Sequence, residues 1–297
     1  MNIYWPIYLN IESEINKLMY AIHMDDSHLN VHSSIISDLI LRCCAEIESL
    51  AKELYKNNGG TKKSGIKYDY DALKFLDDNW MISKKKVLIS SINCFFSKVE
   101  LTPFAKDTPK TDSPGKLTYM WNNAYQNLKH DRRNGLQHGN VEALFEAAAA
   151  LYILNIYFKD KGFELQDDFS GDSLDLSEGS SIFSIECNNG TIYDSTRQFN
   201  KATGFDECVY TTVPIPDTIE EYYSWLDKVV AFRDAYIKEK ENANRDKIRI
   251  MTPEQKEAFD GELAFQATLN IPDDIDMPMH RAMLKIRYRA VLNKNQF

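Results

Sequence analysis

Apolar side chains recur every three or four residues over residues 33–56, which is the clearest helical pattern in the chain. A helix turns once every 3.6 residues, so this spacing places the apolar side chains on one face. Ser33 or Ser34 supplies an N-cap, and an Asn-Asn-Gly-Gly run at residues 57–60 ends the helix. The apolar positions are Ile36, Leu39, Ile40, Cys43, Ile47, Leu50 and Leu54.

Two more segments carry the helical spacing, on either side of a polar stretch at residues 131–140. The apolar positions of the first are Leu117, Met120, Trp121, Ala124, Tyr125 and Leu128. Those of the second are Val141, Leu144, Phe145, Ala148, Leu151, Tyr152 and Phe158. Alanines at 147–150 give this second helix a smooth surface for close packing. Residues 70–100 are predicted to form two shorter helices, the second of which carries Val87, Leu88, Ile92 and Phe95.

Beyond the last of these helices the pattern changes. Short β-prone runs at residues 181–187 and 208–213 are separated by polar turns, which predicts strands within about 181–213. Two prolines end this region, and a long helix is predicted over about 217–242.

The 297 residues are enough to bury one large core or two modest ones. We predict a mainly helical protein, with a helical bundle over residues 1–160 and a smaller α+β portion over residues 161–297. The chain finishes in a basic tail at 280–297, which either packs on the body as a strand or helix or contacts phosphates.

The balance of charge narrows the classes of partner. The chain has 44 acidic and 35 basic side chains, and a net charge of −9 disfavours loose adhesion to nucleic acid or anionic membrane. Five cysteines without CxxC spacing are typical of buried thiols in a reducing compartment. Neither a signal peptide nor a run of ~18 apolar residues is present. We therefore expect a cytoplasmic protein with no membrane partner, in which nucleic acid can bind only at a local patch.

Such a patch lies in the polar stretch between two of the predicted helices. Its basic side chains are Lys129, His130, Arg132, Arg133 and His138. A histidine with an ordinary pKa near ~6.5 can take a proton from a ribose 2′-hydroxyl, and an arginine can hold the scissile phosphate. No zinc-protease, zinc-finger or paired-carboxylate motif accompanies these residues, so the chemistry expected here needs no metal and no cofactor.

The run from Arg133 to His138, with Asn134 directly after the arginine, resembles the Arg-x4–6-His signature of HEPN domains. HEPN proteins are four- to five-helix bundles, commonly dimeric, and many are metal-independent endoribonucleases in toxin–antitoxin, phage-defence and CRISPR-associated systems. The resemblance implies that Arg133 binds the phosphate, that His138 moves the proton and that Asn134 orients one of them. It further implies a homodimer that acts on RNA, with substrate contacts from Lys129, His130 and Arg132.

A second alignment with HEPN-like bacterial proteins competes with the first. These proteins have a Cys-x-Glu-Ile-Glu segment, which Cys44–Glu48 resembles. They also have a Lys-His-Asp-Arg segment followed by an alanine-rich helix, which Ala124–Arg132 and Ala143–Leu154 resemble. Under this alignment the defining residues are 129–132, and His138 has no fixed role. The sequence leaves both alignments open.

Arg133 and His138 also fit a plain alternative, a solvated polar turn. On one unbroken helix they would lie about 140° apart, so a shared site needs either a bend at Gly135 or a second chain. The rival to a nuclease is a catalytically silent HEPN-like scaffold or sensor, in which the 161–297 portion binds a protein or ligand partner.

Arg132 has a structural alternative of its own. It lies four residues after Leu128 and so continues the apolar stripe of that helix, where a cation requires an acidic partner. We expect this partner, for Arg132 or for Lys129, on the first core helix, at Glu46 or Glu48.

Overall fold

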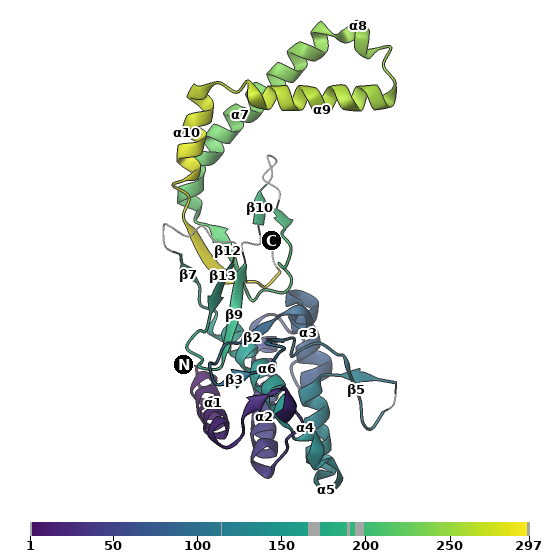
Figure 1. Cartoon of the computed structure of the whole chain (residues 1–297), viewed down its shortest axis with the longest axis vertical. Coiled ribbons are helices and arrows are strands. Elements are labelled where there is room, and N and C mark those ends of the chain that lie inside the picture. Colours follow the sequence, from purple (N-terminus) through teal and green to yellow (C-terminus); the bar gives the residue numbers. More distant parts are fainter. Residues whose placement is uncertain (1, 114, 166–172, 189–190, 194–198, 296–297) are drawn as a thin grey trace.

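Figure 1 shows a helical body at one end, a mixed sheet beside it and a helical arm that projects beyond the sheet. The computed structural model describes residues 2–113, 115–165, 173–188, 191–193 and 199–295. The helices of the body are α1 (Tyr4–Ala21), α2 (Ser34–Asn57), α3 (Leu73–Trp80), α4 (Met120–His130) and α6 (Val141–Lys159). The predicted fold class, mainly helical with a smaller α+β part, is confirmed at this level.

The helix α2 forms where the sequence predicts it. Its N-cap is Ser33, whose hydroxyl accepts a hydrogen bond from the backbone N–H of Ile36 at 3.2 Å. The apolar stripe is buried against α1, α4 and α6. This helix therefore forms the centre of the body.

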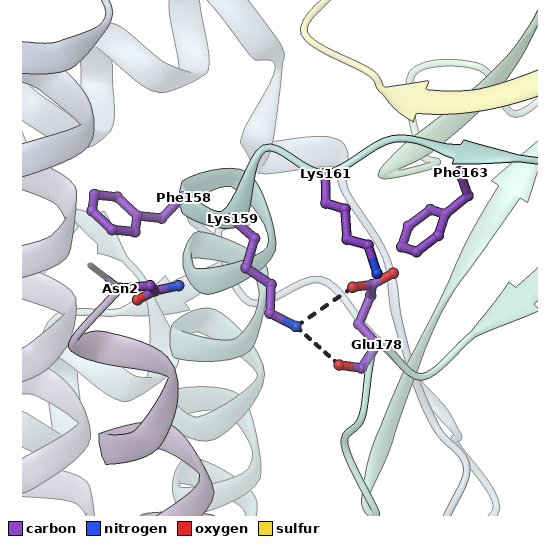
Figure 2. A pocket seen from close by; sticks show the side chains of 6 residues that line it. All are labelled: Asn2, Phe158, Lys159, Lys161, Phe163 and Glu178. Carbon is purple, nitrogen blue, oxygen red and sulfur yellow. Dashed lines mark hydrogen bonds and ion pairs between the residues drawn. The ribbon is translucent and has the colours of Figure 1, made fainter.

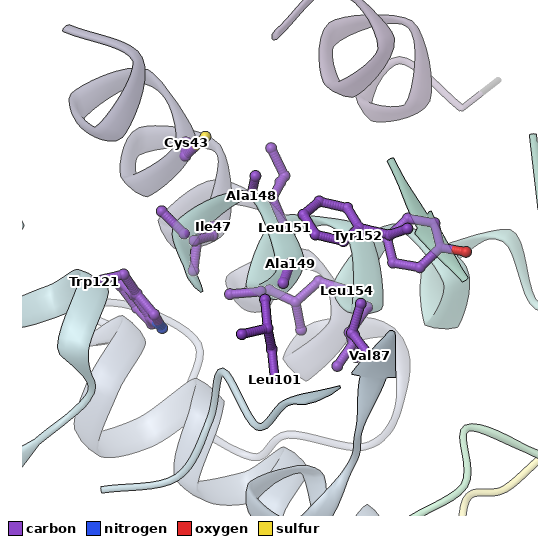
Figure 3. Close-up of a cluster of buried hydrophobic side chains, with 14 of the residues drawn as sticks. Cys43, Ile47, Val87, Leu101, Trp121, Ala148, Ala149, Leu151, Tyr152 and Leu154 are labelled. Carbon is purple, nitrogen blue, oxygen red and sulfur yellow. The ribbon is translucent and has the colours of Figure 1, made fainter. Parts of the chain in front are cut away.

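The helix α6 is buried around almost its whole circumference, with every side chain from Val141 to Tyr157 buried except the half-buried Glu142. Figure 3 shows Ala148 and Ala149 beside Cys43 and Ile47 of α2, where their small side chains allow close packing. The helix is long and apolar enough to cross a membrane, but 89% of its most apolar window is buried inside the protein. It is accordingly a core helix of the kind found in soluble proteins.

The prediction of a second short helix within residues 70–100 is wrong. Val87–Ile89 forms strand β2, and Cys94–Phe95 forms strand β3. Val87 and Ile89 are buried while Leu88 between them is half-buried, which is the two-residue alternation of a strand. Over three residues this alternation cannot be distinguished from a short piece of helical stripe.

A seven-stranded mixed sheet packs beside α6, with the order β4-β2-β9-β12-β13-β7 and β8 added on β9. Its remaining strands are β4 (Glu100–Leu101), β7 (Phe163–Glu164), β8 (Ser173–Leu176), β9 (Phe183–Asn188), β12 (Tyr210–Pro214) and β13 (Tyr288–Leu292). The strands β9 and β12 cover the two β-prone runs of the sequence, and β13 belongs to the basic tail. Strands from both sides of residue 160 thus share one sheet.

Short elements complete the described chain. The helical turns are η1 (Asp26–His28), η2 (Tyr68–Ala72), η3 (Ile82–Lys84), α5 (Arg132–Gly135), η4 (Leu136–His138) and α8 (Arg245–Ile248). The two-stranded pairs are β1 (Met24–Asp25) with β3, β5 (Thr108–Pro109) with β6 (Leu117–Thr118), and β10 (Thr191–Tyr193) with β11 (Phe199–Lys201).

The arm consists mainly of α7 (Pro216–Ala243), α9 (Pro253–Leu269) and α10 (Asp273–Met283), and it returns to the sheet through β13. The helix α7 packs against both α9 and α10. Few side chains of the arm are buried, namely Ile219, Val229, Leu263, Ala267 and Ala282. The arm therefore has only a thin core.

All five cysteines are free thiols, and four of them, all except Cys94, are buried. Burial raises the pKa of the Cys43 thiol to about 12 and that of Cys187 to about 12 as well. These thiols stay neutral at physiological pH, as the sequence predicts for core cysteines.

Candidate functional site

The basic turn, residues 129–138, is held by a helix cap. The helix α4 ends at His130, because Asp131 leaves the helical region with φ −144° and ψ 63°. The Asp131 carboxylate then caps α5: it accepts hydrogen bonds from the backbone N–H of Asn134 (3.4 Å) and from the Asn134 side-chain amide (3.0 and 3.1 Å). The amide that the sequence assigns to orienting a catalytic group is thus engaged inside the cap.

Gly135 lies where α5 packs directly on α4. Its backbone stays near the helical region, with φ −98° and ψ 1°, and the chain continues from α5 into η4. A Cβ built on Gly135 would be only 2.8 Å from the carbonyl oxygen of Asn127. The glycine is required by this close approach, and the bend expected at this position does not form.

Arg133 and His138 do not share a face within one chain. Each residue rotates the chain by about 100° in an α-helix and by about 120° in a 3-10 helix. Across α5 and η4, these steps give a net rotation of about 200° between the two positions. The two side chains therefore leave the turn on opposite sides.

Arg132 has an acidic partner, but not the one expected. Its Nη2 lies 2.6 Å from Oδ1 of Asp38, and both side chains are about half exposed, at 48% and 62%. Arg132 therefore does not continue the buried stripe of α4, because the last buried side chain of the helix is Leu128 and the helix ends at His130. An exposed pair of this kind contributes little to stability, about 0–1 kcal/mol.

Glu46 and Glu48 are too far along α2 to reach the basic turn. The Cys44 thiol contacts the backbone carbonyl of Trp121, so this part of α2 lies beside the start of α4 and not beside its end. Glu48 pairs with Lys52 of its own helix at 2.6 Å. Burial raises the pKa of Glu46, against a lowering effect of the nearby Arg42. The predicted pairing of Glu46 or Glu48 with Arg132 or Lys129 is wrong.

The other basic side chains of the turn are without acidic partners among the described residues. Lys129 contacts only the ring and hydroxyl of Tyr125, with Nζ 5.2 Å from the ring centroid. His130 and Arg133 are exposed and His138 is half-buried, and none of the three side chains forms a hydrogen bond or ion pair within the described chain. The turn thus presents the cations of Lys129 and Arg133 to solvent in a protein whose net charge is −9.

A further histidine lies beside the turn, a position that sequence reasoning did not predict. His32 forms an isolated β-bridge with Asn140, and the backbone N–H of Val141 donates to the carbonyl of Val31 at 3.0 Å. His32 is exposed. More than a hundred residues separate His32 from His138 in the sequence, so only the fold brings them to the same end of the body.

A cavity lies at the opposite end of α6, about 28 Å from the turn along that helix. It measures about 620 Å³ and is lined by Asn2, Phe158, Lys159, Lys161, Phe163 and Glu178. Figure 2 shows Lys159 reaching Glu178, where Nζ donates to the backbone carbonyl at 3.0 Å and lies 3.5 Å from the carboxylate. Lys159 also lies 3.4 Å from the ring centroid of Trp5, so its charge is already satisfied.

A buried polar cluster attaches α1 to the turn before β9. The Tyr8 hydroxyl donates to the Glu12 carboxylate at 2.8 Å, and Ser180 donates to the same oxygen. The backbone N–H of Ser181 donates to it as well, at 3.2 Å. Since these donors satisfy the carboxylate without a cation, the cluster has a structural role.

No group of three or more potential metal ligands is present in the part of the chain that the structure describes. The helical body agrees with a HEPN-like bundle in its helix content alone, and the arrangement of the Arg133–His138 motif stays a prediction. Comparison of the chain with protein-family models, with curated proteins and with solved structures finds no match.

Proposed function

We propose that this chain is a metal-independent endoribonuclease-type effector in bacterial conflict, either phage defence or toxin–antitoxin, and that a second copy completes its active site. One observation carries the proposal: Lys129, His130, Arg133 and His138 stand at one turn without an acidic partner among the described residues. In a chain of net charge −9, the cations of Lys129 and Arg133 are suited to contact the phosphates of a polyanion.

The chemistry follows from the two side chains of the motif. His138 takes the proton of a ribose 2′-hydroxyl, and the freed oxygen attacks the adjacent phosphorus. The bond from phosphorus to the 5′-oxygen breaks, and the protonated His138 returns the proton to that oxygen. The products carry a 2′,3′-cyclic phosphate and a 5′-hydroxyl. Arg133 offsets the charge that develops on the phosphate.

Two copies are needed because Arg133 and His138 leave the turn on opposite sides. A two-fold axis beside the turn rotates the second copy by 180°, which exchanges the two sides of the turn. Arg133 of one copy then lies on the same side as His138 of the other. The dimer then contains two composite sites, each with one arginine and one histidine.

The test is cleavage of structured RNA by the purified protein in EDTA. We expect cleavage, and we expect the variants His138→Ala and Arg133→Ala each to lower the rate by 10²-fold or more. Lys247→Ala, which removes an exposed cation of the arm, serves as the control and should cleave normally. Equal activity of wild type and His138→Ala would exclude this mechanism.

A catalytically silent scaffold or sensor is the second candidate. It is favoured by the engagement of Asn134 with Asp131, which holds the side-chain nitrogen of Asn134 in the cap of α5 and away from a catalytic group. It is favoured further by the projecting arm, which belongs to the portion expected to bind a partner. RNA binding without cleavage, unaffected by His138→Ala, would support this candidate over the first.

A further inference from the structure

The helix α9 of the arm has two apolar faces, and only one of them is covered. On the inner face Leu263 and Ala267 are buried, since α7 packs against this side. On the outer face Phe265 is 59% exposed and Leu269 is 63% exposed. Two residues rotate a helix by about 200°, so Phe265 points away from Leu263.

The outer stripe has the spacing of a helix-packing surface. Its positions recur at steps of three and four residues and are Ala258, Gly261, Phe265 and Leu269. A Cβ built on Gly261 would meet no atom within 4 Å, so the middle of the stripe is an open, shallow site. A residue without a side chain there allows another backbone to approach closely.

The charges around this stripe are of one sign. Glu254, Glu257 and Glu262 are exposed on the outer side of α9. The single basic residue of α9, a helix that the structure describes completely, is Lys256, and it lines a cavity on the inner side together with Arg245. The outer face is therefore apolar along its centre and acidic along its borders.

We propose that this outer face of α9 binds a basic amphipathic helix of a partner protein. The apolar side of that helix covers Phe265 and Leu269, and its lysines or arginines pair with the bordering glutamates. With 17 residues, α9 offers a surface about 25 Å long, enough for several helical turns of a partner.

A second copy of α9 is the wrong occupant. Two α9 helices side by side would place Glu254, Glu257 and Glu262 against the same glutamates, and like charges in such contact disfavour association. The site is also independent of the proposed nuclease, because it uses no residue of the basic turn.

The test uses the whole chain of 297 residues and three synthetic peptides of 17 residues, the length of α9. The first is a leucine/lysine peptide with leucines at helical spacing. The second has the same spacing but glutamates in place of lysines, and the third is a scrambled leucine/lysine peptide without an apolar face. Binding is measured by fluorescence anisotropy at low and at physiological salt.

We expect the leucine/lysine helix to bind more tightly than both control peptides, and more weakly at higher salt. Phe265→Ala and the double variant Glu257→Lys/Glu262→Lys should each weaken its binding about tenfold or more. The matched control, Glu14→Lys/Glu53→Lys, makes the same charge change on the body and should bind like wild type.

Three results would overturn the proposal. They are equal binding of the scrambled peptide, equal weakening by the control variant on the body, and no binding of the leucine/lysine helix at all. Sedimentation gives a further check, because self-association that is lost in Phe265→Ala would assign the face to a second copy. None of these results affects RNA cleavage by the basic turn, so the two proposals fail separately.

Discussion

At Gly135 a single methyl group would collide with the backbone of α4. The nearest atom to the added Cβ is the Asn127 carbonyl oxygen at 2.8 Å, which cannot rotate away as a flexible side chain could. The sequence shows a glycine here and thus permits a bend. The structure instead shows a requirement for close packing between two helical segments.

We therefore expect Gly135→Ala to destabilise the protein by about 1–3 kcal/mol, because the backbone must shift to relieve the contact. The matched control is Gly261→Ala, where the site is open and the helix gains about 0.5–1 kcal/mol from the loss of glycine. Urea denaturation followed by circular dichroism measures both. An unchanged free energy of unfolding in Gly135→Ala would show that α5 adjusts its position at no cost.

Glu146 is a carboxyl group in the core, on α6. Burial is the main reason that its pKa is raised to about 7; Asp107 and Glu142 raise it further, while Lys98 lowers it. In the unfolded chain a glutamate titrates near ~4.3. Between about pH 4 and pH 7 the folded state therefore binds more protons than the unfolded state, and stability falls as the pH rises through this range.

Glu146→Gln removes this penalty. We expect the variant to be more stable than wild type by about 1–3 kcal/mol at pH 8 and equally stable near pH 4. Urea denaturation at pH 4, 6 and 8 gives the comparison. A difference between variant and wild type that does not depend on pH would contradict the raised pKa.

At the scale of elements, the secondary structure could be predicted from a long run of regularly spaced apolar residues but not from a short one. The helix α2 repeats its apolar spacing over 24 residues, so its ends and its buried face agree with the sequence. The strand β2 has only three residues, and its assignment depends on pairing with the nearby β4 and with β9, which is distant in sequence. Local pattern contains no information about such partners.

The candidate site shows the same limit. The sequence identifies the cationic residues of the basic turn but not their surroundings, because these depend on how α2 and α4 are aligned. Arg132 meets Asp38 and not Glu46, since the end of α4 lies beside the start of α2. His32 joins the same end of the body through a contact with Asn140 that no motif indicates.

At the scale of the whole molecule, the basic turn and the arm lie at opposite ends (Figure 1). The turn has exposed basic side chains, while the outer face of α9 is apolar and acidic. Such a separation allows one end to act on RNA while the other binds a protein helix. A dimer formed at the turn would leave both arms free.

The central claim is that one copy supplies Arg133 and the other His138 to a shared site. Mixing Arg133→Ala with His138→Ala, each inactive by itself, tests it most directly. After subunit exchange, about half of the dimers contain one copy of each variant, and each of these has one intact site out of two. RNA cleavage in EDTA should therefore recover to about a quarter of the wild-type rate. Mixing His138→Ala with the double variant Arg133→Ala/His138→Ala restores no site and is the control. If the first mixture stays as inactive as its components while wild type cleaves RNA, the shared site does not exist.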